Sequence, residues 1–186
     1  MHGIMIIDER DSRKDFILNI AKQMMTAART APKGKGIDII EIITVTGDDI
    51  TALSDKMIAM VEEHGMKFFY RDADNILSAD AIVVIGSKEM AQGLNCGYCG
   101  YDTCDARAKN VPCAINVTDL GIAIGSACST AMDLKVDTRV MFSAGLAVKE
   151  LDWMPGCNQI YAIPISASSK NPFFDRKPKE QQSNAK

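Results

Sequence analysis

Histidine is scarce in this chain, and the motifs of two common enzyme classes are missing. The 186 residues include only His2 and His64, and both lie far along the chain from the other candidate functional residues. The sequence contains no G-x-S-x-G motif, and its later serines have no histidine near them, which argues against a serine hydrolase. It also contains no G-x-x-x-x-G-K-[ST] loop, which argues against a P-loop nucleotide-binding protein.

Long apolar runs and an excess of positive charge are also lacking. No segment reaches the roughly 18–20 uninterrupted apolar residues that a membrane-spanning helix requires. The first residues, MHGIMIIDERDSRKD, have no basic region ahead of an apolar stretch, so they do not follow the pattern of a secretion signal. The net charge is −3, so neither nucleic acid nor an anionic membrane is an expected partner. Together these features favour a cytoplasmic protein.

Helical and strand patterns are mixed along the chain, which predicts an α+β fold with one layer of sheet covered by helices. Apolar residues at three- and four-residue spacing predict helices at 11–31, 48–64, 118–135 and 145–151. Apolar and β-branched runs predict strands at 38–45, 80–86, 139–144 and 159–167, with a weaker strand at 66–70. We therefore expect one domain over residues 1–176 and a disordered polar tail over 177–186.

Cysteine, in contrast, is concentrated in one place, the cysteine segment at residues 94–114. Its four thiols follow the spacing C-x2-C-x4-C-x8-C and belong to Cys96, Cys99, Cys104 and Cys113. In a reducing compartment such a group points to metal or redox chemistry rather than to disulfides. Four thiolates from one short segment are able to hold an iron–sulfur cluster or a tetrahedral zinc ion. The interspersed glycines suit the tight turns that such a site needs.

The spacing alone leaves three alternatives open. The segment holds an iron–sulfur cluster, a zinc ion, or neither of these. A zinc knuckle usually pairs two C-x2-C units, whereas this chain has one such unit and no histidine beside it. The number and type of the ligands favour a [4Fe–4S] cluster, with zinc as the alternative metal. Two further cysteines remain as spares: Cys128, which we expect to be a buried core residue, and Cys157, a loop thiol.

The segment CGYCGYDTC resembles the CGxCGxxxC core of a small iron–sulfur domain found in corrinoid iron–sulfur proteins and in electron-transport complex B subunits. This resemblance implies that Cys96, Cys99 and Cys104 are ligands and that a later cysteine is the fourth. In those domains the fourth cysteine lies further downstream than Cys113 does here.

The rest of the chain resembles a family of uncharacterised prokaryotic proteins that contain a ferredoxin domain. The similarity lies in the cysteine segment, in DLGIAIGSA (119–127) and in the ending KNPFFDR (170–176). That family in turn resembles FMN-dependent nitroreductases, here through ERDSRKDFI (9–17) and AARTAPKGKGID (27–38). The resemblance implies a nitroreductase-like α+β fold, in which helices flank a central, mainly antiparallel sheet and the cysteine-rich metal loop is an insertion. It also implies bound FMN and a homodimer with the flavin at the interface.

FMN carries a phosphate near −2 charge, which needs fixed cations around it. Candidate cations lie at the edges of the predicted elements, where they would converge, and we favour Arg13 and Lys33 among them. The full set is Arg10, Arg13, Lys33, Lys35, Lys170 and Arg176. In the turn at 27–38, Lys33, Gly36 and Asp38 replace the polar residues that contact the flavin ring in nitroreductases, so those contacts are not carried over.

Three functional hypotheses follow, of which the third is a catalytically idle nitroreductase scaffold whose dimer surface is the function. The first is an iron–sulfur redox protein that passes electrons between a flavin and a partner protein, an FMN-dependent oxidoreductase of unspecified substrate. The second is a non-catalytic binding or assembly protein in which zinc or a cluster only stabilises the loop. Small residues at four-residue spacing in TDLGIAIGSACSTAMDL permit close helix packing, either in the core or at a dimer interface.

Overall fold

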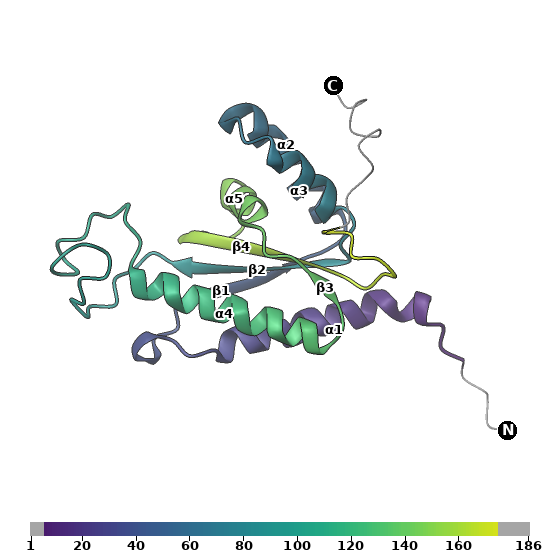
Figure 1. Cartoon of the computed structure of the whole chain (residues 1–186), viewed down its shortest axis with the longest axis horizontal. Coiled ribbons are helices and arrows are strands. Elements are labelled where there is room, and N and C mark those ends of the chain that lie inside the picture. Colours follow the sequence, from purple (N-terminus) through teal and green to yellow (C-terminus); the bar gives the residue numbers. More distant parts are fainter. Residues whose placement is uncertain (1–5, 175–186) are drawn as a thin grey trace.

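The computed structural model describes residues 6–174, and it places helices on both sides of one sheet (Figure 1). The helices are α1 (Glu9–Thr30), α2 (Asp48–His64), α3 (Phe68–Ile76), α4 (Ala114–Asp133) and α5 (Phe142–Glu150), with a single 3-10 turn, η1 (Gly34–Gly36). The strands are β1 (Ile40–Val45), β2 (Ala81–Lys88), β3 (Asp137–Thr138) and β4 (Cys157–Ser166). Arg176 and the predicted tail at 177–186 lie outside the described residues.

The sheet is antiparallel throughout, with the strand order β1-β2-β4-β3. β2 lies between β1 and β4, and every residue of it except Lys88 is buried. Its continuous apolar run follows from this position, because a strand covered on both faces has no solvent side for polar residues to occupy. The predicted antiparallel sheet flanked by helices is confirmed.

Two hydrophobic cores form, one on each face of the sheet. α1 and α4 pack on one face, where small residues such as Ala21, Ala123 and Ala127 let the two helices approach closely. α2, α3 and α5 cover the other face with larger side chains, among them Leu53, Met57 and Phe69 (Figure 1). Within residues 6–174, no helix combines the length and the apolar character that crossing a bilayer would require.

The sequence prediction was wrong at two short segments. The weak strand at 66–70 lies instead at the start of α3, whose buried residues Phe69, Ala73 and Ile76 follow the helical period. The strand predicted at 139–144 is reduced to Met141, which forms an isolated bridge to Ala162 before α5 begins. Aromatic and β-branched residues suggested strands in both places, but a helical face packs against the core there.

A buried hydrogen bond joins two of the helices on the α2–α3–α5 side. Asp72 on α3 is 4% exposed and accepts from Ser143 Oγ on α5 at 2.6 Å. Arg71, which is largely exposed, also donates to Asp72, at 2.7 and 2.9 Å. The pair therefore ties α3 to α5, and Ser54 of α2 likewise donates to the Ala73 carbonyl of α3.

Replacing Asp72 by alanine is expected to destabilise the fold by about 2–4 kcal/mol, because the buried Ser143 hydroxyl loses its acceptor. Asp55→Ala is the matched control, since Asp55 is an exposed residue of α2 and its change should stay within about 0.5 kcal/mol. Urea unfolding of both variants measures the difference. Equal unfolding free energies would show that the bond contributes nothing.

Candidate functional site

The cysteine segment lies in the long connection between β2 and α4, and it projects from the end of the sheet at which β2 ends (Figure 1). Its backbone turns sharply at three residues with positive φ, which are Asn95 (48°), Gly97 (72°) and Gly100 (87°). Glycine and asparagine adopt this conformation at the lowest cost, so the residue types around the first two cysteines fit the turns they make. The structure has turns rather than a helix between Cys104 and Lys109.

The first three thiols lie near the surface of this loop. Cys96 is exposed, and Cys99 and Cys104 are half-buried. Cys104 is held by a reciprocal pair of contacts, in which the Asn95 N–H donates to Cys104 Sγ at 3.4 Å and the Cys104 N–H donates to Asn95 Oδ1 at 2.8 Å. Amide donors directed at sulfur stabilise the thiolate form, which is the form that binds metals.

Cys113 differs from these three, because it is buried and lies at the N-terminal cap of α4. Burial by itself would raise the pKa of its thiol. The nearby backbone N–H groups of Asn116, Gln92 and Ile115 counter this effect on the pKa, however, and the Arg107 charge adds to theirs. The pKa of Cys113 is consequently held below its ordinary value, which suits a thiolate ligand.

The four thiol groups of the cysteine segment do not lie together in this structure. Among residues 6–174, no three histidine, cysteine, aspartate or glutamate side chains come together closely enough to hold an ion. A shared metal group would have to gather the loop around itself, as happens where metal binding and local folding are coupled. The spare thiols are set apart chemically, since burial raises the pKa of both Cys128 and Cys157.

A polar network that the sequence analysis missed fixes the base of the cysteine segment. Gln92 Nε2 donates to Asn116 Oδ1 at 2.9 Å, and Lys35 Nζ on η1 donates to the Gln92 carbonyl at 3.0 Å. The Gly34 N–H on η1 donates to the buried Asp119 of α4 at 2.9 Å. The loop, η1 and α4 are therefore held together. The signal in the sequence was the presence of Asn116 and Asp119 in an otherwise apolar helix.

The candidate flavin cations fall into two groups at opposite ends of α1. Arg10 and Arg13 lie in its first turns, whereas Lys33 and Lys35 follow its C-terminus. A helix of 22 residues is about 33 Å long at about 1.5 Å per residue, so one chain does not bring the two groups together. Lys170 lies in the loop after β4. The backbone N–H of Asp80 donates to the Ile165 carbonyl near the end of that strand. The side chain of Asp80 also interacts electrostatically with Arg13.

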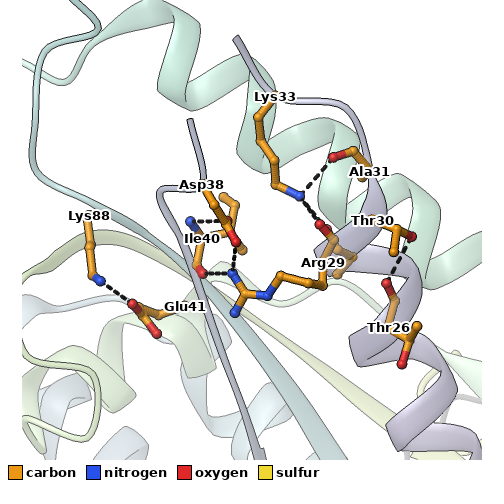
Figure 2. A network of polar contacts seen from close by, with 10 residues as sticks. Thr26, Arg29, Thr30, Ala31, Lys33, Asp38, Ile40, Glu41 and Lys88 are labelled. Carbon is orange, nitrogen blue, oxygen red and sulfur yellow. Dashed lines mark hydrogen bonds and ion pairs between the residues drawn. The ribbon is translucent and has the colours of Figure 1, made fainter. Parts of the chain in front are cut away.

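Arg13 and Lys33 each have a partner of their own. Arg13 forms a bidentate ion pair with Glu9 one turn earlier, at 2.7 Å for both contacts. The Lys33 ammonium folds back onto the last carbonyls of α1, donating to Ala28 at 3.0 Å, to Ala31 at 2.8 Å and to Arg29 (Figure 2). Burial lowers the pKa of Lys33. Lys33 therefore acts as a cap for the helix in this structure.

Part of this chain matches a known protein family. Residues 109–176 match the family described as "Uncharacterized protein containing a ferredoxin domain (DUF2148)". A protein of Archaeoglobus fulgidus, named "Uncharacterized protein", is 39% identical over 186 residues, which cover 95% of this chain and all of the relative. The chain belongs to this ferredoxin-domain family. The matched stretch includes Cys113 and begins after the CGYCGYDTC motif.

Solved structures identify the fold as that of the nitroreductases. A nitroreductase with bound FMN from Desulfitobacterium hafniense superposes with a TM-score of 0.56 at 16% identity, covering 96% of this chain and 87% of the other. An oxidoreductase containing FMN superposes with a TM-score of 0.57 at 13% identity, covering 82% of this chain and 67% of the other. At these identities the likeness shows the fold alone, and the predicted nitroreductase-like α+β fold is confirmed.

Proposed function

We propose that this member of the ferredoxin-domain family is a redox protein whose Cys96, Cys99, Cys104 and Cys113 hold a [4Fe–4S] cluster. The observation that carries the proposal is the environment of Cys113. This residue is buried at the N-terminus of a long helix, where nearby backbone N–H groups lower the pKa of its thiol and the helix dipole also favours negative charge. Such an environment favours the thiolate form that binds metals, whereas an apolar core favours the protonated, inert thiol.

The loop that carries the other three thiols supports the same proposal. Its positive-φ residues turn the backbone around Cys96 and Cys99, and the Asn95 amide already donates to Cys104. When bound, a cluster of this kind supplies one-electron transfer, and hydrogen bonds to its sulfurs tune the reduction potential. The surrounding residues of this chain orient the thiols and provide those donors. The family's ferredoxin domain agrees with this chemistry.

The test is the metal content of protein purified without oxygen. About four irons and four acid-labile sulfides per chain, with a visible band that bleaches on reduction by dithionite, are the expected results. One zinc per chain without iron would overturn the proposal, and would favour instead the alternative of a metal-stabilised binding or assembly protein. Flavin is measured in the same sample after desalting.

We also propose that FMN binds between two copies of the chain. The two cation groups are about 33 Å apart in one protomer, at the two ends of α1. Two protomers with antiparallel α1 helices would bring Arg10 and Arg13 of one copy toward Lys35 of the other. The Arg13–Glu9 pair lies on the surface, where ion pairs contribute little to stability, so a phosphate is able to displace Glu9. The FMN-binding neighbours in the same fold agree with this proposal.

The outward face of α4 is the proposed dimer surface. It carries no charged side chain between Val117 and Met132, and Ile122 and Met132 are 41% and 66% exposed on it. A Cβ added at Gly121 or Gly125 would meet nothing within 4 Å, so this face is smooth as well as apolar. Small residues of this kind let a second helix approach closely, and an exposed apolar face marks an interaction site.

Replacing Ile122 by glutamate is expected to weaken a dimer by at least 100-fold, because it places a charge in the apolar contact. Ile58→Glu is the matched control, since Ile58 is 43% exposed in the middle of α2, on the other side of the sheet. Sedimentation equilibrium measures the mass, and the fluorescence of flavin released by denaturation of the desalted protein measures the flavin that stays bound. Unchanged mass and flavin in Ile122→Glu would place the interface elsewhere.

A further inference from the structure

A groove runs beside Cys113, at the end of β2, between the cysteine segment, β4 and α5. Its inner part is lined by Cys113, Arg107 and Ser87, and its outer part by Lys109, Asn110 and Lys149. Glu89, Pro112, Asn158 and Gln159 line both parts, so the two are continuous. The outer part has a volume of about 540 Å³, which is in the range of small-molecule sites.

The charge of the groove is opposite to that of the whole chain. Its walls carry the cations Lys88, Arg107, Lys109 and Lys149 and the single carboxylate of Glu89, although the chain has a net charge of −3. Lys88 is neutralised by Glu41. Lys109 and Lys149 are exposed and form no ion pair within residues 6–174. A concave surface that gathers unpaired charge of one sign concentrates ligands of the other sign.

Arg107, at the inner end of the groove, has one donor without a partner among the described residues. Its Nη1 donates to the Val111 carbonyl, but its Nε is buried and has no hydrogen-bond partner. A buried donor without an acceptor costs about 1–3 kcal/mol, so it is rarely left in this state. The inner part has a volume of only about 10 Å³, which is room for one water molecule and not for an oxyanion, so a larger ligand would lie in the outer part.

A β-bulge shapes the floor of the groove. Ser87 pairs with Gln159 and Lys88 pairs with Cys157, so Asn158 is an extra residue in β4. In a regular strand Asn158 and Gln159 would point to opposite faces of the sheet, yet both line the groove. Bulges that redirect a side chain in this way occur often beside functional sites. Here the bulge adds a second amide to the cationic walls.

We propose that this groove binds a small molecule through a phosphate group. Two unpaired lysines from different segments, Lys109 and Lys149, suit a dianionic oxyanion in the outer part, and the amides of Asn158 and Gln159 complete its hydrogen bonds. The site is distinct from the proposed flavin phosphate site, since Arg10 and Arg13 lie at the far end of α1.

The test is the binding of inorganic pyrophosphate to the full-length protein purified without oxygen. Isothermal titration calorimetry measures the dissociation constant. The variant Lys109→Gln/Lys149→Gln should bind at least tenfold more weakly than the wild type. The control Lys22→Gln/Lys67→Gln makes the same change in net charge at exposed positions outside the groove, and should stay within twofold. Asn158→Leu keeps every charge and fills the groove, and should also weaken binding at least tenfold.

Four results would overturn the proposal. The first is the absence of saturable pyrophosphate binding by the wild type, and the second is equal weakening in the groove and control variants. The third is full binding by Asn158→Leu, which would mean that charge alone attracts the anion. The last is loss of bound flavin together with pyrophosphate binding in the groove variants, which would assign the groove to the FMN phosphate.

Discussion

Replacing Cys113 by alanine should remove most of the iron from protein purified without oxygen, from about four atoms per chain to less than one. The three remaining thiols lie on a loop that does not hold them together by itself, because no three of them converge in the described residues. Cys113 is the one ligand fixed to a long helix, and its pKa is already lowered by backbone donors. Its loss therefore removes both a ligand and the anchor of the site.

Cys128→Ala is the matched control for this prediction. Cys128 lies on the same helix α4, is half-buried, and has its pKa raised by burial. Alanine at either position removes one sulfur atom and preserves the helix, so thermal unfolding of the two apoproteins should agree within a few degrees. Iron, sulfide and zinc are then measured in both. Full iron in Cys113→Ala, or equal loss in both variants, would show that Cys113 is not the fourth ligand.

Much of the fold was accessible from the sequence because its long elements have strong periodicity. The helices at 11–31 and 48–64 and the buried strand at 80–86 appear within a few residues of their predicted bounds. Gly65 ends α2 with φ 69°, as its position in the sequence indicated. The strand predictions for the short segments 66–70 and 139–144 were wrong because a window of five or six aromatic or β-branched residues does not reveal which neighbouring element will bury them. Asp72 and Ser143, 71 residues apart, meet only in the folded chain.

The candidate site divides in the same way. Local spacing marked the four cysteines and the turn glycines, because a metal loop is built from one continuous segment. The convergence of the flavin cations was not a local property, and α1 places its two ends about 33 Å apart. Lys33, one of the two favoured cations, caps the helix that precedes it. The groove beside Cys113 was invisible in the sequence, since β2, β4, α5 and the cysteine segment each supply part of its wall.

Gly145→Ala should be the most destabilising single methyl addition among the helical glycines. Gly145 lies in α5 where this helix rests directly on β4. A Cβ there would lie 1.9 Å from the Ile160 carbonyl oxygen, 2.5 Å from its carbon and 2.9 Å from Tyr161 Cα. All three atoms belong to the backbone of a paired strand, so no side chain can rotate away and α5 itself must move. We expect a loss of about 3 kcal/mol or more, a large share of the usual 5–15 kcal/mol.

The same substitution at Gly121 should have the opposite sign. Gly121 is exposed in the middle of α4, and an added Cβ meets nothing within 4 Å there. Alanine is favoured over glycine in a helix by about 0.5–1 kcal/mol, so Gly121→Ala should stabilise the protomer by that amount. Both variants are made in the Ile122→Glu background, which keeps any α4 contact between copies out of the urea midpoint. If alanine shifts the two urea midpoints in the same direction, the contact between α5 and β4 does not restrict the side chain at residue 145. In that case α5 is able to move away from β4 without loss of packing.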